Sequence, residues 1–264
     1  MPRKPRGRAT LELCPRLRYP SGVRRPVRIP IEGIQQGLRE LPPAMGHYVA
    51  RVLRRTRGDV LLLFDPRIGI EALAEVCSVD GARVQVEVGV PFQAAVPQRE
   101  VILLQAVGKG DKMDTVVQDA TELGATRIFP VLTERTVVQP GSRSAARVER
   151  WRRIADSAAR QCGRALAPVV EEIAPLLTVT SSVEAVLRLA LVPWAEHAAG
   201  PLLLGERGSI AFLVGPEGGL TETEVRLLAE GGWLPASLGS TTLRTETVAA
   251  AVLGALLVLS VSER

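Results

Sequence analysis

A short polar segment near the C-terminus has residue types that could do chemistry. Leu243–Thr247 (LRTET) directly precedes the apolar run Val248–Val261, which is too short to span a bilayer and predicts a buried helix. Its threonines could cap that helix, and Glu246 could complement the positive end of the helix dipole. Arg244 has no such explanation, because a cation opposes the dipole there. We therefore expect Arg244 to face an anion or to take part in function.

A glycine-rich turn is the second candidate. The apolar strand expected at Ile210–Val214 runs into Gly215–Gly219 (GPEGG), and Thr221–Glu224 then fits a helix capping box. In open α/β sheets ligands bind at the carboxyl ends of strands, and glycines let backbone N–H groups approach them closely. The dinucleotide fingerprint G-x-G-x-x-G is absent. The residues alone leave a ligand-binding turn and a plain tight turn equally open.

Two lysines occupy a similar position further upstream. Lys109 and Lys112 stand between the apolar strand expected at Val101–Val107 and a helix expected at Lys112–Leu123. The phosphate-loop pattern G-x-x-x-x-G-K-[ST] is not matched. Contacts to phosphate or RNA, and solvated lysines at a helix start, remain equal alternatives.

Other kinds of chemistry have little support. Three cysteines without paired spacing and two histidines make a disulfide framework or a zinc site improbable, so we expect no metal and a reducing, cytoplasmic location. No apolar segment typical of a signal peptide follows the basic N-terminus, and we expect no membrane segment. No nucleophile–histidine–acid set has recognisable spacing.

Charge is distributed unevenly along the 264 residues. Residues 1–58 contain 14 Lys and Arg and three acids, a net charge of +11, so the rest of this +5 chain carries −6. Arginine dominates over lysine, and its forked guanidinium suits phosphate groups, which favours a nucleic-acid partner over a solvated basic tail. Arg51, Arg54 and Arg55 close a helix expected at Ala44–Arg55 and are candidates for this contact.

The elements that must position these residues fall into three parts. We expect a basic arm at 1–22 and a β-rich module at 23–90 with strands at Val60–Phe64, Glu71–Val79 and Arg83–Val88. Pro91–Pro97 is the expected linker. Residues 98–264 then alternate strands with helices, which predicts a mostly parallel sheet covered on both faces. The further elements expected there are strands at Ile128–Leu132 and Leu189–Val192 and helices at Glu149–Cys162 and Thr247–Leu259.

Five segments in order carry a family resemblance: 108–124 (GKGDKMDTVVQDATELG), 132–138 (LTERTVV), 160–164 (RQCGR), 213–224 (LVGPEGGLTETE) and 238–247 (LGSTTLRTET). With 47–54 (HYVARVLR) and 58–65 (GDVLLLFD), the chain resembles the ribosomal RNA small subunit methyltransferase E family, the 16S rRNA uridine-N3 methyltransferases of the SPOUT superfamily. The resemblance implies a PUA-like β-barrel followed by an α/β domain with a deep trefoil knot, S-adenosylmethionine (SAM) as cofactor, a homodimer, and 16S rRNA in the 30S subunit as partner.

The resemblance also implies roles for particular residues. Arg244 and Glu246 would be catalytic, with Arg244 favouring the uridine N3 anion and Glu246 orienting it or capping the helix. Arg135 and Arg164 would contact RNA together with Lys109, Lys112 and the arginines of the first module. The expected cofactor-binding residues are Leu191, Val192, Val214, Gly215, Pro216, Glu217, Gly218, Gly219, Leu238, Gly239, Ser240, Leu243, Arg244 and Thr245.

Two other functions stay open on the sequence. A related SPOUT enzyme could methylate ribose 2′-O instead, and a non-catalytic assembly factor could keep the fold while binding RNA. Intact GPEGG and LRTET segments argue against the second alternative, and the combination of the N-terminal module with GKGDKMD and RQCGR argues against the first.

Overall fold

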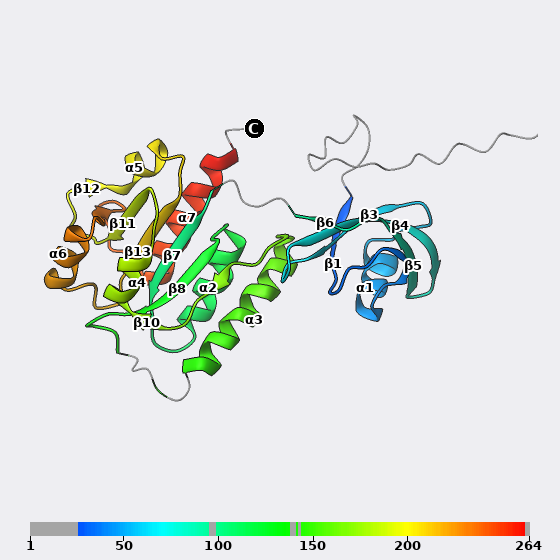
Figure 1. Cartoon of the computed structure of the whole chain (residues 1–264), viewed down its shortest axis with the longest axis horizontal. Helices are drawn as coiled ribbons and strands as arrows, with labels where there is room; N and C mark the ends of the chain where they lie inside the picture. Colours follow the sequence, from blue (N-terminus) through cyan, green and yellow to red (C-terminus); the bar gives the residue numbers. More distant parts are fainter. Residues whose placement is uncertain (1–25, 95–98, 138–140, 142–143, 262–264) are drawn as a thin grey trace, which may run out of the picture.

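The computed structural model describes residues 26–94, 99–137, 141 and 144–261. Figure 1 shows two bodies, each built on its own sheet, with helix α3 reaching from one towards the other. The basic arm expected at 1–22 lies outside the described residues, as does 95–98 of the expected linker.

The first body is a small, mainly antiparallel sheet. Its strands are β1 (Val27–Pro30), β2 (Gly37–Glu40), β3 (Val60–Asp65), β4 (Ile70–Asp80), β5 (Arg83–Val88) and β6 (Phe92–Gln93), in the order β1-β3-β4-β5-β2 with β6 on β4. The β1–β3 pair is parallel and the others are antiparallel. Within the described residues the path ends at β1 and β2, and no pairing between these two strands closes it. Alternate residues of β5 are buried, as expected for a sheet with one face on a core.

Two expectations for this body need correction. The single helix expected at Ala44–Arg55 is a short helix α1 (Pro43–His47) followed by a π-helical turn η1 (Tyr48–Val52), in which the Leu53 N–H donates to the Tyr48 carbonyl at 2.9 Å. The linker expected from Pro91 onwards includes β6, because the backbone of Phe92–Gln93 pairs with Ile70 and Glu71. Sequence periodicity does not reveal a two-residue edge strand.

The second body is an α/β sheet in which every described strand pair is parallel. The order is β10-β8-β7-β13-β11-β14-β12, with β9 on β8. The strands are β7 (Val101–Ala106), β8 (Arg127–Leu132), β9 (Val169–Val170), β10 (Ala174–Pro175), β11 (Leu187–Leu191), β12 (His197–Ala198), β13 (Ile210–Val214) and β14 (Leu234–Ser237). Strands β7 and β13 are buried along their whole length, as expected for central parallel strands.

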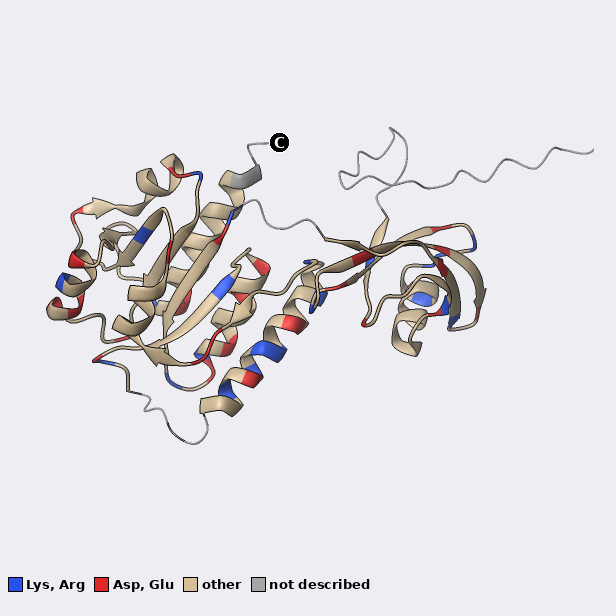
Figure 2. Cartoon of the chain, in the orientation of Figure 1, with Lys and Arg blue, Asp and Glu red and all other residues tan. Residues whose placement is uncertain are grey.

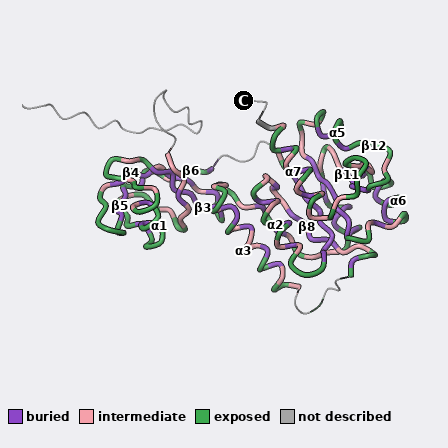
Figure 3. The backbone as a smooth tube through the Cα atoms, turned by 180° about the vertical axis from the view of Figure 1, so that it is seen from behind, coloured by how far each residue is buried: buried purple, intermediate pink, exposed green. Residues whose placement is uncertain are grey.

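Helices cover both faces of this sheet. One core joins it to α2 (Lys112–Glu122), α3 (Ser144–Cys162), α5 (Ala199–Gly205) and α7 (Thr245–Val261), and a second core joins the other face to α4 (Leu176–Ser182) and α6 (Glu222–Glu230). The buried strands run through the middle of this body in Figure 3. The expected α/β class and the alternation of strands and helices are confirmed. Helix α3 begins at Ser144, five residues before the expected start.

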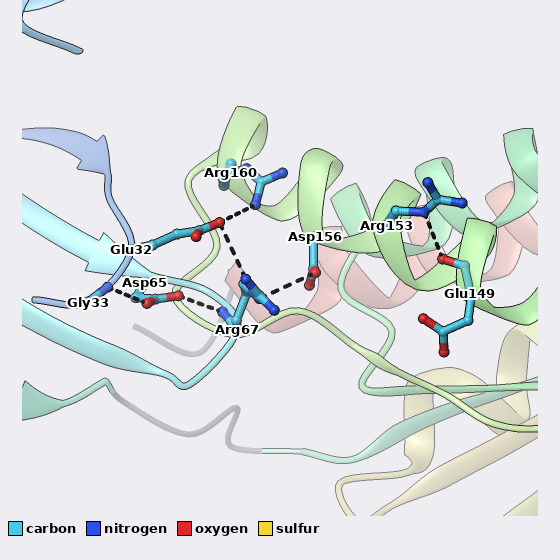
Figure 4. A network of polar contacts seen from close by, with 8 residues as sticks. All are labelled: Glu32, Gly33, Asp65, Arg67, Glu149, Arg153, Asp156 and Arg160. Atoms are coloured by element: carbon cyan, nitrogen blue, oxygen red, sulfur yellow. Dashed lines mark hydrogen bonds and ion pairs between the residues drawn. The ribbon is translucent and has the colours of Figure 1, made fainter. Parts of the chain in front are cut away.

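The two bodies meet at the turn after β3 (Figure 4). The Arg67 guanidinium lies between the carboxylates of Glu32, at 3.5 Å, and Asp156 on α3, at 3.8 Å. The Ala167 N–H, beyond α3, donates to the Pro66 carbonyl at 2.9 Å. Buried Asp65 holds the turn in shape, since its carboxylate accepts the backbone N–H groups of Gly33 and Arg67, both at 3.1 Å. We call this contact the junction.

Candidate functional site

A cavity of about 640 Å³ lies at the carboxyl edge of the parallel sheet. Its walls are the chain after β11, the turn after β13 and the segment that leads into α7. This volume falls in the range of small-molecule and cofactor sites. Its lining residues are Lys112, Arg135, Leu191, Val192, Pro193, Trp194, Val214, Gly215, Pro216, Glu217, Gly218, Gly219, Leu220, Thr242, Leu243, Arg244, Thr245, Glu246 and Val248.

The glycine turn is shaped by a few specific backbone needs. Gly219 has φ = +73°, a region that favours glycine, and its N–H donates to the Pro216 carbonyl at 2.8 Å. A Cβ added to Gly215 would lie 3.2 Å from Leu220 Cγ, so the Leu220 side chain would have to shift to make room for it. The three glycines therefore contribute backbone to this wall of the cavity, beside the side chains of Pro216 and Glu217.

The capping box after the turn also fastens the neighbouring loop. Thr221 Oγ1 accepts the Glu224 N–H at 3.2 Å, and the Glu224 carboxylate accepts the N–H groups of Thr221, at 2.9 Å, and Glu134, at 2.8 Å. Glu224 is only 7% exposed, so its charge depends on these donors. Arg135 follows in that loop and donates through Nη1 to the Gly218 carbonyl at 2.8 Å. The box thus places a cation on the cavity wall.

A second cation on the wall comes from α2. Lys112 Nζ lies 2.8 Å from Glu217 Oε1. This hydrogen bond is the main cause that raises the pKa of Lys112 and the main cause that lowers the pKa of Glu217. Both groups therefore stay charged across the neutral range, and the pair ties α2 to the glycine turn.

Arg244 is exposed in the wall of the same cavity, and its guanidinium makes no ion pair with any described residue. Its carbonyl accepts the Val248 N–H at 2.9 Å, which places Arg244 at the start of α7. The helix begins at Thr245, two residues before the expected start. Arg244 thus stands at the positive end of a helix dipole and forms no ion pair within the described part of the chain, as its unexplained charge in the sequence suggested.

Glu246 lies beside it in the first turn of α7. Its own backbone N–H is the main cause that lowers the pKa of Glu246, followed by a 3.1 Å hydrogen bond from Thr245 Oγ1 and by the charges of Lys112 and Arg244. Glu246 is therefore an anion that complements the helix dipole. These contacts are consistent with Glu246 as a cap of α7. That Glu246 orients Arg244 stays a prediction.

A narrow apolar cavity of about 40 Å³ adjoins the larger one. Both cavities share Leu191, Val192, Pro193, Leu243 and Val248, while Leu238 and Gly239 line the small one alone. Gly239 has φ = +137°, which again favours glycine. Of the residues expected to bind a cofactor, Ser240 alone lines neither cavity.

The structure separates the expected RNA-binding residues into groups. Lys109 is exposed before α2 and does not line the cavity, whereas Lys112 and Arg135 do. Arg164 lies at the amino edge of the sheet. Its Nη1 donates to the carbonyl of Thr121 in the last turn of α2, at 2.7 Å, and to that of Ala125, which follows α2, at 2.8 Å. Its guanidinium thus has a structural task, and contact with RNA stays a prediction.

Of the three arginines expected to contact RNA from the first module, Arg51 lies within η1, and Arg54 and Arg55 follow it. Arg51 and Arg54 are exposed and Arg55 is half-buried, and Arg54 has φ = +51°, which is unusual for a residue other than glycine. The ribbon in Figure 2 shows basic residues near α1, and both basic and acidic residues along α3.

Five residues of the cavity wall are absent from the site residues expected from the sequence: Pro193, Trp194, Leu220, Thr242 and Val248. A Pro-Trp pair directly after an apolar strand is a detectable signal, because a turn residue and a large aromatic there lie at the carboxyl edge.

The described residues contain no cluster of three or more His, Cys, Asp and Glu that could hold a metal ion. Among those same residues no helix combines the length and apolarity needed to cross a membrane.

Solved structures with this arrangement include methyltransferases. A ribosomal RNA small subunit methyltransferase E from Neisseria gonorrhoeae, bound to S-adenosyl methionine, is 30% identical with a TM-score of 0.70, over 89% of this chain and 98% of that one. A putative methyltransferase from Legionella pneumophila, in complex with SAM, is 32% identical with a TM-score of 0.69, over 90% and 98%.

Sequence comparison gives the family. A family model described as an RNA methyltransferase domain matches residues 95–257. The ribosomal RNA small subunit methyltransferase E of Synechocystis sp. is 34% identical over 82% of this chain and 73% of that protein, and that of Mycobacterium tuberculosis is 32% identical over 81% and 84%. The chain belongs to the RNA methyltransferase family and, within it, to the ribosomal RNA small subunit methyltransferase E proteins.

Proposed function

We propose that this protein uses SAM to methylate N3 of a specific uridine in the 16S rRNA of the small ribosomal subunit. The observation that carries the proposal is Arg244, a cation that forms no ion pair among the described residues and lines a cavity of about 640 Å³. The named relatives support the ribosomal substrate, and the SAM-bound structures support the cofactor.

The cavity walls suit SAM. Gly215, Gly218 and Gly219 leave backbone groups of the turn uncovered, and the apolar side chains of Leu191, Leu238 and Leu243 around the adjoining cavity would contact the flat face of an adenine. Thr245 and Glu217 contribute polar atoms in the larger cavity. When bound, the cofactor supplies an electrophilic methyl group next to these residues.

Arg244 would activate the methyl acceptor, N3 of the uridine. The imide proton of uridine N3 leaves only at alkaline pH, so an enzyme must favour the anion. A fixed guanidinium can accept the negative charge that develops on the two uracil oxygens, and such preorganised charges are among the strongest catalytic effects. Glu246 would keep Arg244 oriented or cap α7.

The remaining assignments follow from the same proposal. Residues 23–90 would form a PUA-like RNA-binding module, 98–264 a SPOUT domain with a trefoil knot, and 1–22 a basic arm. The enzyme would act in the cytoplasm as a homodimer. Lys109, Lys112, Arg135 and Arg164 would contact RNA beside the module's Arg51, Arg54 and Arg55.

The test is to map the modified nucleotide. Purified 30S subunits from a strain that lacks the protein are incubated with the enzyme and SAM, and digestion with mass spectrometry locates the methyl group. A methyl group on uracil N3 supports the proposal; one on a ribose 2′-oxygen, or no methylation by a chain that binds SAM, contradicts it.

A second measurement addresses the first module. Replacing Arg51, Arg54 and Arg55 together by alanine should weaken 30S binding and reduce the salt dependence of affinity, because each phosphate contact releases counterions. An unchanged salt slope would show that these arginines are a solvated surface.

A further inference from the structure

One aromatic residue on the cavity wall has an unusual environment. The chain has three tryptophans. Trp151 and Trp233 are each 2% exposed, and their indole N–H groups donate to Asp114 Oδ1, at 3.1 Å, and the Thr180 carbonyl, at 3.3 Å. Trp194 is 60% exposed and lines the large cavity. Its apolar ring therefore stays in contact with water although two core clusters lie close by.

The backbone presents this ring on a fixed support. Val192–Ala195 is a turn at the end of β11, closed by the Ala195 N–H, which donates to the Val192 carbonyl at 3.2 Å. The Val192 N–H itself donates to the Ala236 carbonyl at 3.0 Å and ties the turn to β14. Pro193 occupies the second position of the turn, where its fixed φ is favourable. Trp194 thus follows a rigid residue on an anchored turn.

Charge divides the two cavities. Trp194 lines the large cavity together with three cations, Lys112, Arg135 and Arg244, and two carboxylates, Glu217 and Glu246. The small cavity shares Val192 and Pro193 with it and is lined by neither Trp194 nor any charged residue. A cofactor adenine can lie against the apolar residues Leu191, Leu243 and Val248, which both cavities share. A nucleotide of RNA needs the other combination, a π-face for its base and cations for its phosphate and carbonyl oxygens.

We infer that Trp194 is the residue on which the target uracil stacks after it leaves the RNA helix. Enzymes that modify a base take it out of the stack, and an aromatic side chain replaces part of the lost stacking energy. The inference rests on the proposed function, since it gives the same cavity its substrate-positioning residue. The ring lines the same cavity as Arg244, so a uracil stacked on Trp194 would share that cavity with the guanidinium.

Kinetics on 30S subunits test this inference. Trp194→Ala should raise KM for 30S subunits about 5- to 150-fold, the range for losing one base–aromatic stack. Trp194→Phe keeps a π-face, so its KM for 30S subunits should stay close to that of the wild type. SAM affinity, measured by calorimetry, should change less than about twofold. A loss of SAM affinity with an unchanged KM for 30S would assign Trp194 to the cofactor and overturn the inference.

Fluorescence gives a second readout that needs no turnover. Iodide should quench Trp194 and leave the two buried tryptophans unaffected, with Trp194→Phe as the control. Uridine monophosphate, added to the S-adenosylhomocysteine complex, should protect Trp194 from iodide. Protection by S-adenosylhomocysteine alone, or conversion of a dimer to a monomer in Trp194→Ala, would overturn the inference. Methylation mapped to another nucleotide class would contradict the proposed function, while the protection by uridine monophosphate would still report on Trp194.

Discussion

The two edges of the parallel sheet differ in how they use charge. At the carboxyl edge, Arg244 is unpaired among described residues and Lys112 and Arg135 border an open cavity. At the amino edge, Arg164 donates to backbone carbonyls, and the nearby Arg67 and Arg160 meet carboxylates at the junction. Arg244 is therefore available to a ligand, and Lys112 and Arg135 border the same cavity while they contact Glu217 and the Gly218 carbonyl. The cations at the amino edge hold the protein together. Substitutions at the two edges should affect different measurements.

The largest effect is expected at the carboxyl edge. Arg244→Ala should lower single-turnover methylation of 30S subunits by about 10²–10³-fold, the usual cost of removing one preorganised charge-stabilising donor. The fold should stay intact, because Arg244 forms no ion pair with any residue that the structure describes. The matched control is Arg226→Ala, an exposed arginine on α6. Normal turnover in Arg244→Ala would remove the catalytic role.

The largest loss of stability is expected at the junction. Asp65→Asn removes the charge from a 4% exposed carboxylate that accepts two backbone N–H groups, so the free energy of unfolding should fall by about 2 kcal/mol. Urea denaturation measures this free energy. The control is Asp80→Asn, at an exposed position of the β4–β5 hairpin. Equal stability of both variants would show that Asp65 does not hold the turn.

A smaller effect on cofactor binding is expected at the glycine turn. In Gly215→Ala the new Cβ would approach Leu220 to 3.2 Å, which should displace the turn and weaken SAM binding by about tenfold, or 1.4 kcal/mol. Gly200→Ala on α5, where a Cβ meets nothing within 4 Å, is the control. Calorimetry with SAM distinguishes them, and an unchanged affinity would show that the turn does not contact the cofactor.

Breaking the ion pairs at the junction should affect binding of 30S subunits more than it affects protein stability. Arg67→Ala removes ion pairs to Glu32 and Asp156, whose side chains are each at least 29% exposed. The free energy of unfolding should therefore change by less than about 1 kcal/mol. Because Arg67 joins the bodies, KM for 30S subunits should rise while SAM affinity stays constant. A parallel loss of both would show that the junction supports the cavity itself.

The smallest effect is a pH dependence. The pKa of Glu217 is lowered by Lys112, so the stability from this contact is present above the unfolded-state pKa of Glu217 and lost as pH falls through its lowered value. The Tm difference between wild type and Glu217→Gln should therefore be present at pH 7 and vanish in strong acid. A constant difference across this range would assign the effect to packing.

Strong periodic signals predicted much of the fold. Strands β5 and β13 have the expected bounds, β7 and α2 end within one residue of them, and α6 begins at its capping box because local hydrogen bonds determine that start. Short edge strands such as β6, β9 and β12 were missed, since two residues have no periodicity and pair only when a neighbouring strand is in place.

For the site, the sequence alone determined which residues needed an explanation. Arg244 conflicted with a helix start, and the glycines predicted a close backbone approach, because both arguments depend on local physics. Tertiary structure decided the rest. It brought the turn after β11, with Trp194, beside the turn after β13 and the start of α7. It also gave the two arginines Arg164 and Arg244 opposite surroundings. Parallel strand order, which no local pattern encodes, sets which chain segments share an edge of the sheet.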